Sequence, residues 1–389
     1  MKKIVLVGLY FEQNLGDPML FDCAKYLLMQ HGDYDIQYFD IFGRSACNTE
    51  GSLSTLKQFV TKGLEFFRMT ELIRKLMNRK FNAEDFSRRA EEAFNNAEMI
   101  VIVGGGITKY SVRYDFSFVF EQLAGIAEKL NIPVIIGPTG IEGRFEKSDS
   151  GFQRMMRGYC GKTVKMAATR DRLDVLNSLL EKSPVEGKLL ADFGVWSGET
   201  YQINKDENSK IVGFGLITPY RFREYGVDLS ETELISLWIK IVAELEQRGY
   251  KWRLFSNGQY TDQEFGERLL KKMGLPVNEE YIVSRPRHPR ELVQTVSQFM
   301  GIITHRLHST IIAYSLGIPF IALSWNPKVN YFAERIDCEK WVFGSENFDA
   351  RVIVDQFEKA IKNGYDPAIR MRFKEETDCF MNQVAKLLS

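Results

Sequence analysis

The sequence has few histidines, no CxxC pair and no net charge. The last two absences each exclude a class of protein. The 389 residues include five cysteines, none of them in a CxxC pair. The sequence therefore contains no zinc pattern and no disulfide framework, which fits a reducing compartment. Lys plus Arg and Asp plus Glu are each 51. The overall charge gives no indication of nucleic-acid binding, so any anion site must be local.

Long hydrophobic runs are missing as well. The N-terminus, MKKIVLVGLYF, has a short apolar run that Glu12, Gln13 and Asn14 interrupt, which favours a first strand over a signal peptide. No uninterrupted apolar run approaches the roughly 20 residues of a transmembrane helix. We therefore expect a cytoplasmic protein. Its hydrophobic content of 44% is typical of a globular enzyme, and its length favours two domains.

Strand and helix patterns alternate along the first half of the chain. Continuous apolar runs, typical of parallel strands covered on both faces, occur at Ile4 to Gly8, Met99 to Val103, Pro133 to Gly137 and Val164 to Thr169. Helix patterns follow these runs. Alternation of this kind predicts an α/β fold with a doubly wound parallel sheet.

The loop after the first strand, NLGDP, contains the polar residues Asn14 and Asp17. Asp17 precedes Pro18 in a good helix-start arrangement, so turn and cap chemistry explains much of this loop. A binding role is also compatible, because open α/β sheets bind ligands at the carboxyl ends of their strands.

Two later loops of the first half hold further candidates. Gly104, Gly105 and Gly106 follow a strand and allow a ligand to approach the backbone closely. The triplet matches neither GxGxxG nor the P-loop. Arg170 comes at the start of the helix pattern at 171–181, where pairing with an aspartate is the structural alternative to a binding role.

A long helix pattern at 53–81 has a mostly basic polar side. Such a helix can lie on an anionic membrane surface, which would place the protein at the inner face of the membrane. Alternatively, it packs on its own sheet with a solvated polar face. We prefer the second interpretation because helices of that kind are common.

The second half repeats the alternation, with strand patterns at 211–216, 251–255 and 280–283. The polar stretch Ser197 to Ser209 marks the linker. We expect three segments: an N-terminal Rossmann-like domain at 1–200, a C-terminal Rossmann-like domain at 208–365, and a terminal helix at 366–389 that packs back on the first domain. Two such domains imply a cleft, where ligands usually bind.

The stretch from Thr304 to Val329 contains two of the four histidines. His305, Arg306 and His308 lie between a buried strand pattern and a helix pattern, so unpaired N–H groups of the helix start would lie beside a cation. Arginine binds phosphate or carboxylate, and histidine exchanges a proton near neutral pH. The combination predicts an anion site with proton transfer. The alternative is that these side chains make structural hydrogen bonds.

Together, NLGD, GGG, TRD and RLHST…SLGIPFIALSWNPKV resemble the polysaccharide pyruvyl transferase family, in the family's order, from about residue 3 to residue 335. The resemblance implies a two-domain fold like that of B-type glycosyltransferases, with the active site in the cleft. It also implies an activity that moves the enolpyruvyl group of phosphoenolpyruvate onto two sugar hydroxyls as a cyclic ketal and releases phosphate. That chemistry requires no cofactor and no metal.

The resemblance also implies roles for residues. Arg306 would bind the donor anion, and His308 would act as general acid. Lys328 would neutralise the departing phosphate, and Arg221 is a second candidate for the donor site. The remaining substrate-binding candidates are His305 and Arg170 and, facing the acceptor, Asn14, Asp17, Gly104, Gly105 and Gly106. The partners would be phosphoenolpyruvate and a sugar or lipid-linked oligosaccharide. The sequence leaves open whether the chain forms a homo-oligomer.

The chain departs from the family pattern at two places. Ser309 and Thr310 stand where small apolar residues are more usual, and Trp325 and Asn326 stand where an aromatic and an acidic residue are commoner. Neither departure removes a cation or the acid. They put the identity of the acceptor sugar in doubt.

Two other functions are compatible with the sequence. A nucleotide-sugar-dependent glycosyltransferase would have the same fold, with Glu334 as a candidate for the ribose hydroxyls. A non-catalytic partner could keep the fold and lose turnover. The intact Arg306 and His308 argue against the second.

Overall fold

The computed structural model describes residues 1–46, 83–110, 115–223 and 225–388. The helix predicted at 53–81 therefore lies outside the described residues. The chain forms two compact units. Unit 1 contains Met1–Glu12, Leu20–Asp192 and Glu376–Ser389, and unit 2 contains Gln13–Met19 and Phe193–Glu375. The NLGD loop is thus grouped with unit 2, which differs from the boundary expected from the sequence.

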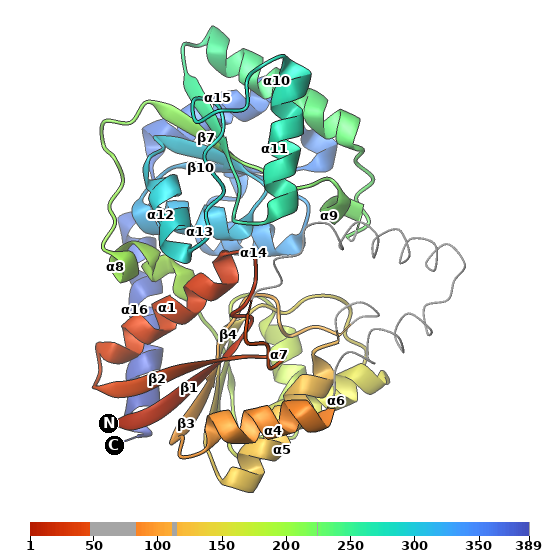
Figure 1. Cartoon of the computed structure of the whole chain (residues 1–389), viewed down its shortest axis with the longest axis vertical. Helices are drawn as coiled ribbons and strands as arrows, with labels where there is room; N and C mark the ends of the chain where they lie inside the picture. The colour runs from red at the N-terminus through yellow and green to blue at the C-terminus, as the bar shows by residue number, and fades with distance from the viewer. Residues whose placement is uncertain (47–82, 111–114, 224, 389) are drawn as a thin grey trace. The chain divides into compact units, whose positions relative to one another are not determined.

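Unit 1 is built on a six-stranded sheet in the order β2-β1-β3-β4-β5-β6 (Figure 1). The strands, all parallel to their neighbours, are β1 Lys2–Gly8, β2 Tyr34–Asp40, β3 Met99–Ile102, β4 Val134–Thr139, β5 Val164–Thr169 and β6 Gly187–Leu189. Every residue of β3 and β4 is buried. Burial on both faces explains their continuous apolar runs, because a central parallel strand needs apolar side chains on both faces.

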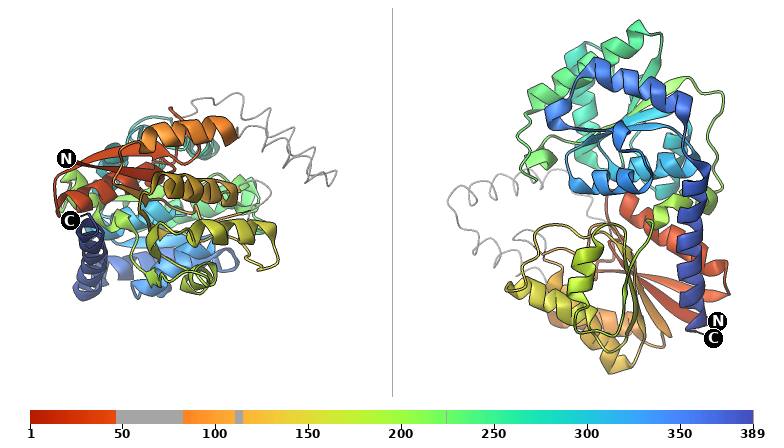
Figure 2. Two further views of the ribbon diagram at one scale, coloured as in Figure 1. Left: turned by 90° about the horizontal axis from the view of Figure 1, so that it is seen from below. Right: turned by 180° about the vertical axis from the view of Figure 1, so that it is seen from behind.

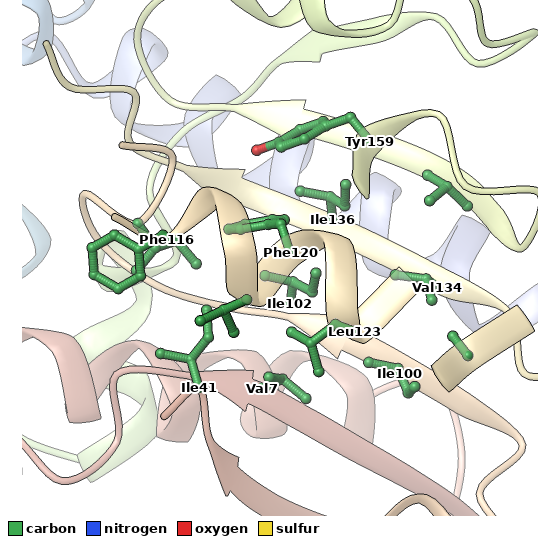
Figure 3. Packing of buried hydrophobic residues seen from close by; sticks show 14 of the residues in the cluster. Val7, Ile41, Ile100, Ile102, Phe116, Phe120, Leu123, Val134, Ile136 and Tyr159 are labelled. Carbon is green, nitrogen blue, oxygen red and sulfur yellow. The ribbon is translucent and has the colours of Figure 1, made fainter. Parts of the chain in front are cut away.

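In the part of unit 1 that the structure describes, the helices are α1 Gly16–Met29, whose first turn belongs to unit 2, then α4 Ala83–Phe94, α5 Ser117–Leu130, α6 Ser150–Tyr159 and α7 Leu173–Leu179. Alternate residues of the strands, such as Ile100 and Ile102, pack against α4, α5 and α6 in one core (Figure 3). Helices α5 and α6 approach closely where Phe120 stacks on Tyr159, with ring centroids 5.3 Å apart.

The terminal helix α16, Pro367–Lys386, has its last residues in unit 1. There Asp378 lies 2.8 Å from His31 Nε2, and Lys188 donates to Gln383. The two termini lie side by side (Figure 2), where Lys2 donates to the Leu388 carbonyl.

Unit 2 contains a five-stranded parallel sheet in the order β11-β10-β9-β7-β8. Its strands are β7 Ile211–Gly215, β8 Lys251–Phe255, β9 Gly301–Thr304, β10 Phe320–Ser324 and β11 Val342–Gly344. The strand predicted at 280–283 is wrong, because Ile282 forms only an isolated bridge with Leu254. The prediction of an α/β protein with two parallel sheets is confirmed.

The longer helices of unit 2 are α10 Glu231–Gln247, α11 Tyr260–Met273, α12 Pro289–Ser297, α13 Leu307–Leu316, α14 Pro327–Arg335 and α15 Ala350–Asn363. Two shorter ones are α8 Ser197–Tyr201 and α9 Tyr220–Arg223. Helix α10 begins with a capping box, in which Ser230 accepts from the Glu233 N–H and the Glu233 side chain accepts from the Ser230 N–H.

The strand order of unit 2 fixes where its loops gather. From β7 the chain passes to β8 on one side, and β9 then pairs with β7 on the other side. The carboxyl ends of β7 and β9 therefore form the point at which the winding reverses. Open α/β sheets bind their ligands at this point.

Candidate functional site

Helix α13 begins at the carboxyl end of β9. The four residues of β9 are buried, and Arg306 is the N-cap of α13, with extended backbone angles and no side-chain capping bond. Thr304 Oγ1 accepts from the Arg306 N–H at 3.0 Å and donates to the Gly215 carbonyl at 3.1 Å. The first turn of α13 is therefore fixed to β7, and its N–H groups face the end of the sheet.

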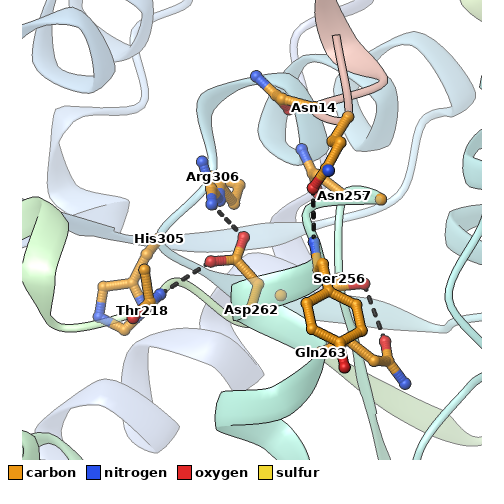
Figure 4. A network of polar contacts seen from close by, with 12 residues as sticks. Asn14, Thr218, Ser256, Asn257, Asp262, Gln263, His305 and Arg306 are labelled. Atoms are coloured by element: carbon orange, nitrogen blue, oxygen red, sulfur yellow. Dashed lines mark hydrogen bonds and ion pairs between the residues drawn. The ribbon is translucent and has the colours of Figure 1, made fainter. Parts of the chain in front are cut away.

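Arg306 forms a buried ion pair with Asp262 from the first turn of α11 (Figure 4). Asp262 is fully buried, and it also accepts from the Thr218 N–H at 2.9 Å. Burial lowers the pKa of the Arg306 guanidinium, and the Asp262 carboxylate opposes that effect. Arg306 Nε has no hydrogen-bond partner in the described part of the chain. Asp262 thus binds Nη2 of the guanidinium, while Nε has no partner among the described residues.

Arg221 lies on α9, just after the carboxyl end of β7. Its N–H donates to the Thr218 carbonyl at 3.1 Å, so Asp262 and Arg221 fix the same turn. The positive charge of Arg221 contributes to lowering the pKa of Arg306. Unit 2 therefore brings Arg306 and Arg221 together where its winding reverses, and their role in donor binding remains a prediction.

The NLGD loop packs against the start of α13. Leu15 donates its N–H to the Asn257 carbonyl at 2.9 Å. Gly16 lies so close to the His308 ring that a Cβ at this position would be 1.9 Å from Nδ1. Glycine is thus required here by contact with the histidine.

Asn14 and Asp17 flank that glycine. Asn14 Nδ2 donates to Asp17 Oδ2 at 3.2 Å, and the Asp17 charge raises the pKa of Arg306. Asn14 Oδ1 is buried and has no partner among the described residues. Unit 2 therefore collects Asn14, Asp17, Arg221, Arg306 and His308.

His305 lies in the aromatic core of unit 2. Its ring makes edge contacts with Phe222 and Trp238, with centroids 5.3 Å apart in both pairs. Neither ring nitrogen has a hydrogen-bond partner within the described ranges, and burial lowers the pKa of His305 to about 3. The structure therefore places a neutral His305 among aromatic rings and next to Arg306, and its expected substrate-binding role remains a prediction.

Lys328 is the second residue of α14, which follows β10, the neighbour of β9. Asn326 caps this helix, because its Oδ1 accepts from the Lys328 N–H at 3.0 Å. Trp325 donates from Nε1 to the His305 carbonyl at 2.7 Å. The unusual pair Trp325 and Asn326 thus has structural contacts of its own.

Ser309 and Thr310, the other departure from the family pattern, also use their hydroxyls. Ser309 donates to Asn257 Oδ1, and Thr310 donates to the Arg306 carbonyl at 3.2 Å. Both hydroxyls therefore stabilise the turn that carries Arg306 and His308.

Arg170 and the glycine triplet belong to unit 1. Arg170 forms a buried ion pair with Asp192. The Gly105 carbonyl accepts from the Gly140 N–H at 2.6 Å, and a Cβ on Gly140 would lie 2.9 Å from Arg170 Nη2. These contacts fix the ends of β3, β4 and β5, so Arg170 has the structural ion pair that was considered as the alternative to a binding role.

Sequence reasoning missed Asp262 and Asn257. Both follow the carboxyl end of β8, next to β7 in the sheet. The signal available was a polar stretch, SNGQYTD, directly after an apolar run. Their partners lie on other elements, so the sequence did not show which polar residues of that stretch face the site.

The described part of the chain contains neither a cluster of metal ligands nor a membrane-spanning helix. Within residues 1–46, 83–110, 115–223 and 225–388, no group of three or more His, Cys, Asp or Glu side chains could hold a metal ion. Over the same ranges, no helix has the length and apolar character needed to cross a membrane.

Solved structures of low sequence identity share this fold. The UDP-GlcNAc 2-epimerase of Methanocaldococcus jannaschii matches with a TM-score of 0.56 at 12% identity, over 100% of this chain and 99% of that chain. The UDP-GlcNAc 2-epimerase of Neisseria meningitidis, bound to UDP-GlcNAc, matches with a TM-score of 0.51 at 12% identity, over 100% and 98%. The fold is thus of the glycosyltransferase-B-like class, as predicted. No curated protein sequence matches the chain.

A family model gives a more specific result than the fold. The model described as polysaccharide pyruvyl transferase matches residues 14–327. This range begins at the NLGD loop and ends just after the β10 strand, so it includes both the residues gathered around α13 and the glycine triplet of unit 1. The chain belongs to the polysaccharide pyruvyl transferase family.

Proposed function

We propose that the protein transfers the enolpyruvyl group of phosphoenolpyruvate to a sugar of a cell-surface polysaccharide or its precursor. The product is a pyruvate ketal, and phosphate is released. The observation that carries the proposal is the pair of cations Arg306 and Arg221, beside His308, at the reversal point of the unit 2 sheet. A donor with a phosphate and a carboxylate needs at least one fixed cation, and two suit it better.

Arg306 binds the donor anion in this proposal. The ion pair with Asp262 orients the guanidinium, and Nε remains to donate to the ligand. Arg221 supports the same anion from the β7 side. Lys328, at the start of α14, neutralises the phosphate as it leaves.

His308 acts as general acid. It protonates the methylene carbon of phosphoenolpyruvate, which makes the adjacent C2 electrophilic. Because Nδ1 packs on Gly16, we assign the transferred proton to Nε2. One sugar hydroxyl then adds to C2, and its proton passes to His308, which restores the acid. The C–O bond to phosphate breaks, the second hydroxyl closes the ring, and its proton leaves with the phosphate.

The acceptor is a sugar or a lipid-linked oligosaccharide, and the reaction takes place in the cytoplasm. Asn14 Oδ1, a buried acceptor atom without a partner in the described ranges, suits a hydroxyl group. Gly104, Gly105 and Gly106 of unit 1 remain candidates for the acceptor. The family match supports this function over transfer from a nucleotide sugar, and Glu334, considered for the ribose, lies exposed on α14.

The proposal is tested by product analysis. The protein is incubated with phosphoenolpyruvate and a panel of sugar glycosides, and inorganic phosphate and ketal are measured together. We expect phosphate release that depends on one acceptor and matches the ketal formed. Sugar transfer from a nucleotide sugar, without use of phosphoenolpyruvate, would contradict the proposal.

A further inference from the structure

Asn257 is a buried residue of unit 2 that none of the family motifs contains. It follows β8 and is 1% exposed. Its backbone carbonyl accepts from the Leu15 N–H at 2.9 Å, and its side-chain Oδ1 accepts from the Ser309 hydroxyl. Asn257 therefore connects the NLGD loop to the first turn of α13, the turn that Arg306 caps.

Among the described residues, one end of the Asn257 amide has no protein partner. Nδ2 is buried and makes no hydrogen bond within the described residues, and Arg306 Nε is in the same state. Figure 4 shows Asn257 in the same group of polar residues as Arg306 and Asn14. Buried donors are rarely left unpaired, so each such atom calls for an explanation. Two of them at one helix start, beside two arginines, indicate an anionic ligand.

A neighbouring amide shows that the fold can satisfy such groups. Gln263, on α11, accepts from the Ser256 hydroxyl at 2.9 Å and donates to the Val283 carbonyl at 3.2 Å. Turning the Asn257 amide over would place Nδ2 on Ser309 and leave Oδ1 unpaired instead. In either orientation one end of this amide has no partner in the described residues. The positive charges nearby attract an anion, and an anion accepts a hydrogen bond from the donor end.

We propose that Asn257 Nδ2 donates a hydrogen bond to the anionic donor substrate, beside Arg306. Ser309 holds the amide in the orientation that presents Nδ2. The contact is with an oxygen of the phosphate or of the carboxylate, since both accept hydrogen bonds from an amide. This inference rests on the proposed function, because the ligand is phosphoenolpyruvate.

The test is calorimetric binding of phosphoenolpyruvate to the full chain with Asn257→Asp. Aspartate has nearly the same shape and still accepts from Ser309, but it replaces the donor with a negative charge. We expect the dissociation constant to rise at least about tenfold, as for the loss of a hydrogen bond to a charged group. Gln263→Glu is the matched control, and its constant should stay within about threefold because both ends of that amide have protein partners.

Additional measurements check that the variants fold and show which part of the substrate loses affinity. Thermal melting checks that each variant folds, and Ser309→Ala, which frees the amide to rotate, replaces Asn257→Asp if the latter does not fold. Inorganic phosphate and pyruvate, used as separate probes, show which end of the substrate loses affinity. If the wild type binds phosphoenolpyruvate and Asn257→Asp binds it equally well, the inference is overturned and the proposed function stands. The same holds if Gln263→Glu loses as much affinity as Asn257→Asp. A wild-type protein that binds no phosphoenolpyruvate would overturn the proposed function and this ligand with it.

Discussion

The polar side chains at the start of α13 differ in how many of their atoms have hydrogen-bond or ion-pair partners. Arg306 has Nη2 on Asp262 and Nε without a partner in the described chain. Asp262 itself is satisfied, since it binds Arg306 and the Thr218 N–H. The ion pair with Asp262 holds the guanidinium in one orientation. Removing either partner would leave an uncompensated buried charge.

Arg306→Lys keeps the charge and loses the planar fork. We expect phosphoenolpyruvate to bind about tenfold to a hundredfold more weakly, because lysine cannot pair with Asp262 and present a second donor in the same geometry. Calorimetry measures the change. Arg88→Lys, in an exposed ion pair on α4, serves as control and should bind normally. Wild-type affinity in Arg306→Lys would show that the arginine is structural.

His308→Ala removes the proposed acid. Turnover should fall by about a hundredfold to ten-thousandfold, the usual contribution of a general acid, while donor binding stays within a few fold. Phosphate release and calorimetry on the same preparation separate the two effects. Turnover retained in this variant would remove His308 from the mechanism.

His305 gives a prediction about stability and pH. Its pKa is about 3 when folded and about 6.5 in the unfolded chain, so the unfolded state binds the proton first as pH falls. Stability from this group is present above about pH 6.5 and decreases below it, by about 2 kcal/mol between pH 6.5 and pH 5. Urea unfolding of wild type and His305→Phe should show this loss in the wild type only. Parallel pH curves would mean that His305 is protonated in the fold.

At the scale of elements, the β9–α13–β10 segment and the NLGD loop form one structure. The loop is distant in sequence from α13, yet Gly16 supports the His308 ring and Leu15 binds the carbonyl of Asn257. A short loop from the start of the chain thus fixes one side of the proposed acid.

Gly16→Ala tests that contact. A Cβ would lie 1.9 Å from His308 Nδ1, so the ring must move and turnover should fall at least about tenfold. Gly125→Ala is the control, since nothing lies within 4 Å of a Cβ at that position in α5. It should keep full turnover and gain about 0.5–1 kcal/mol of stability. Equal turnover in both variants would contradict the role of Gly16.

Most elements could be predicted from the sequence, because their signals are local. Continuous apolar runs marked β1, β3 and β9, and the pattern after Arg306 marked α13. The contacts of the site could not be predicted in the same way. Arg306 and Asp262 are 44 residues apart, and no local pattern reports such a pairing. Nor does composition distinguish His305, in the aromatic core, from His308 three residues later.

For the whole molecule, the family match at 14–327 spans parts of both units. The donor chemistry is assigned to unit 2, and the acceptor role of the unit 1 glycines remains a prediction. The membrane contact considered for 53–81 lies outside the described residues. Sedimentation with anionic vesicles at low salt would test it, since such binding is screened by salt.

Binding of phosphoenolpyruvate by the cations of unit 2 is the step on which the proposed mechanism depends. The most direct measurement is calorimetric titration of the wild-type protein with phosphoenolpyruvate and with a panel of nucleotide sugars, without added metal. The proposed mechanism predicts saturable binding of phosphoenolpyruvate that weakens in Arg306→Lys, and no binding of the nucleotide sugars. Binding of a nucleotide diphosphate sugar instead of phosphoenolpyruvate would contradict it and favour a glycosyltransferase.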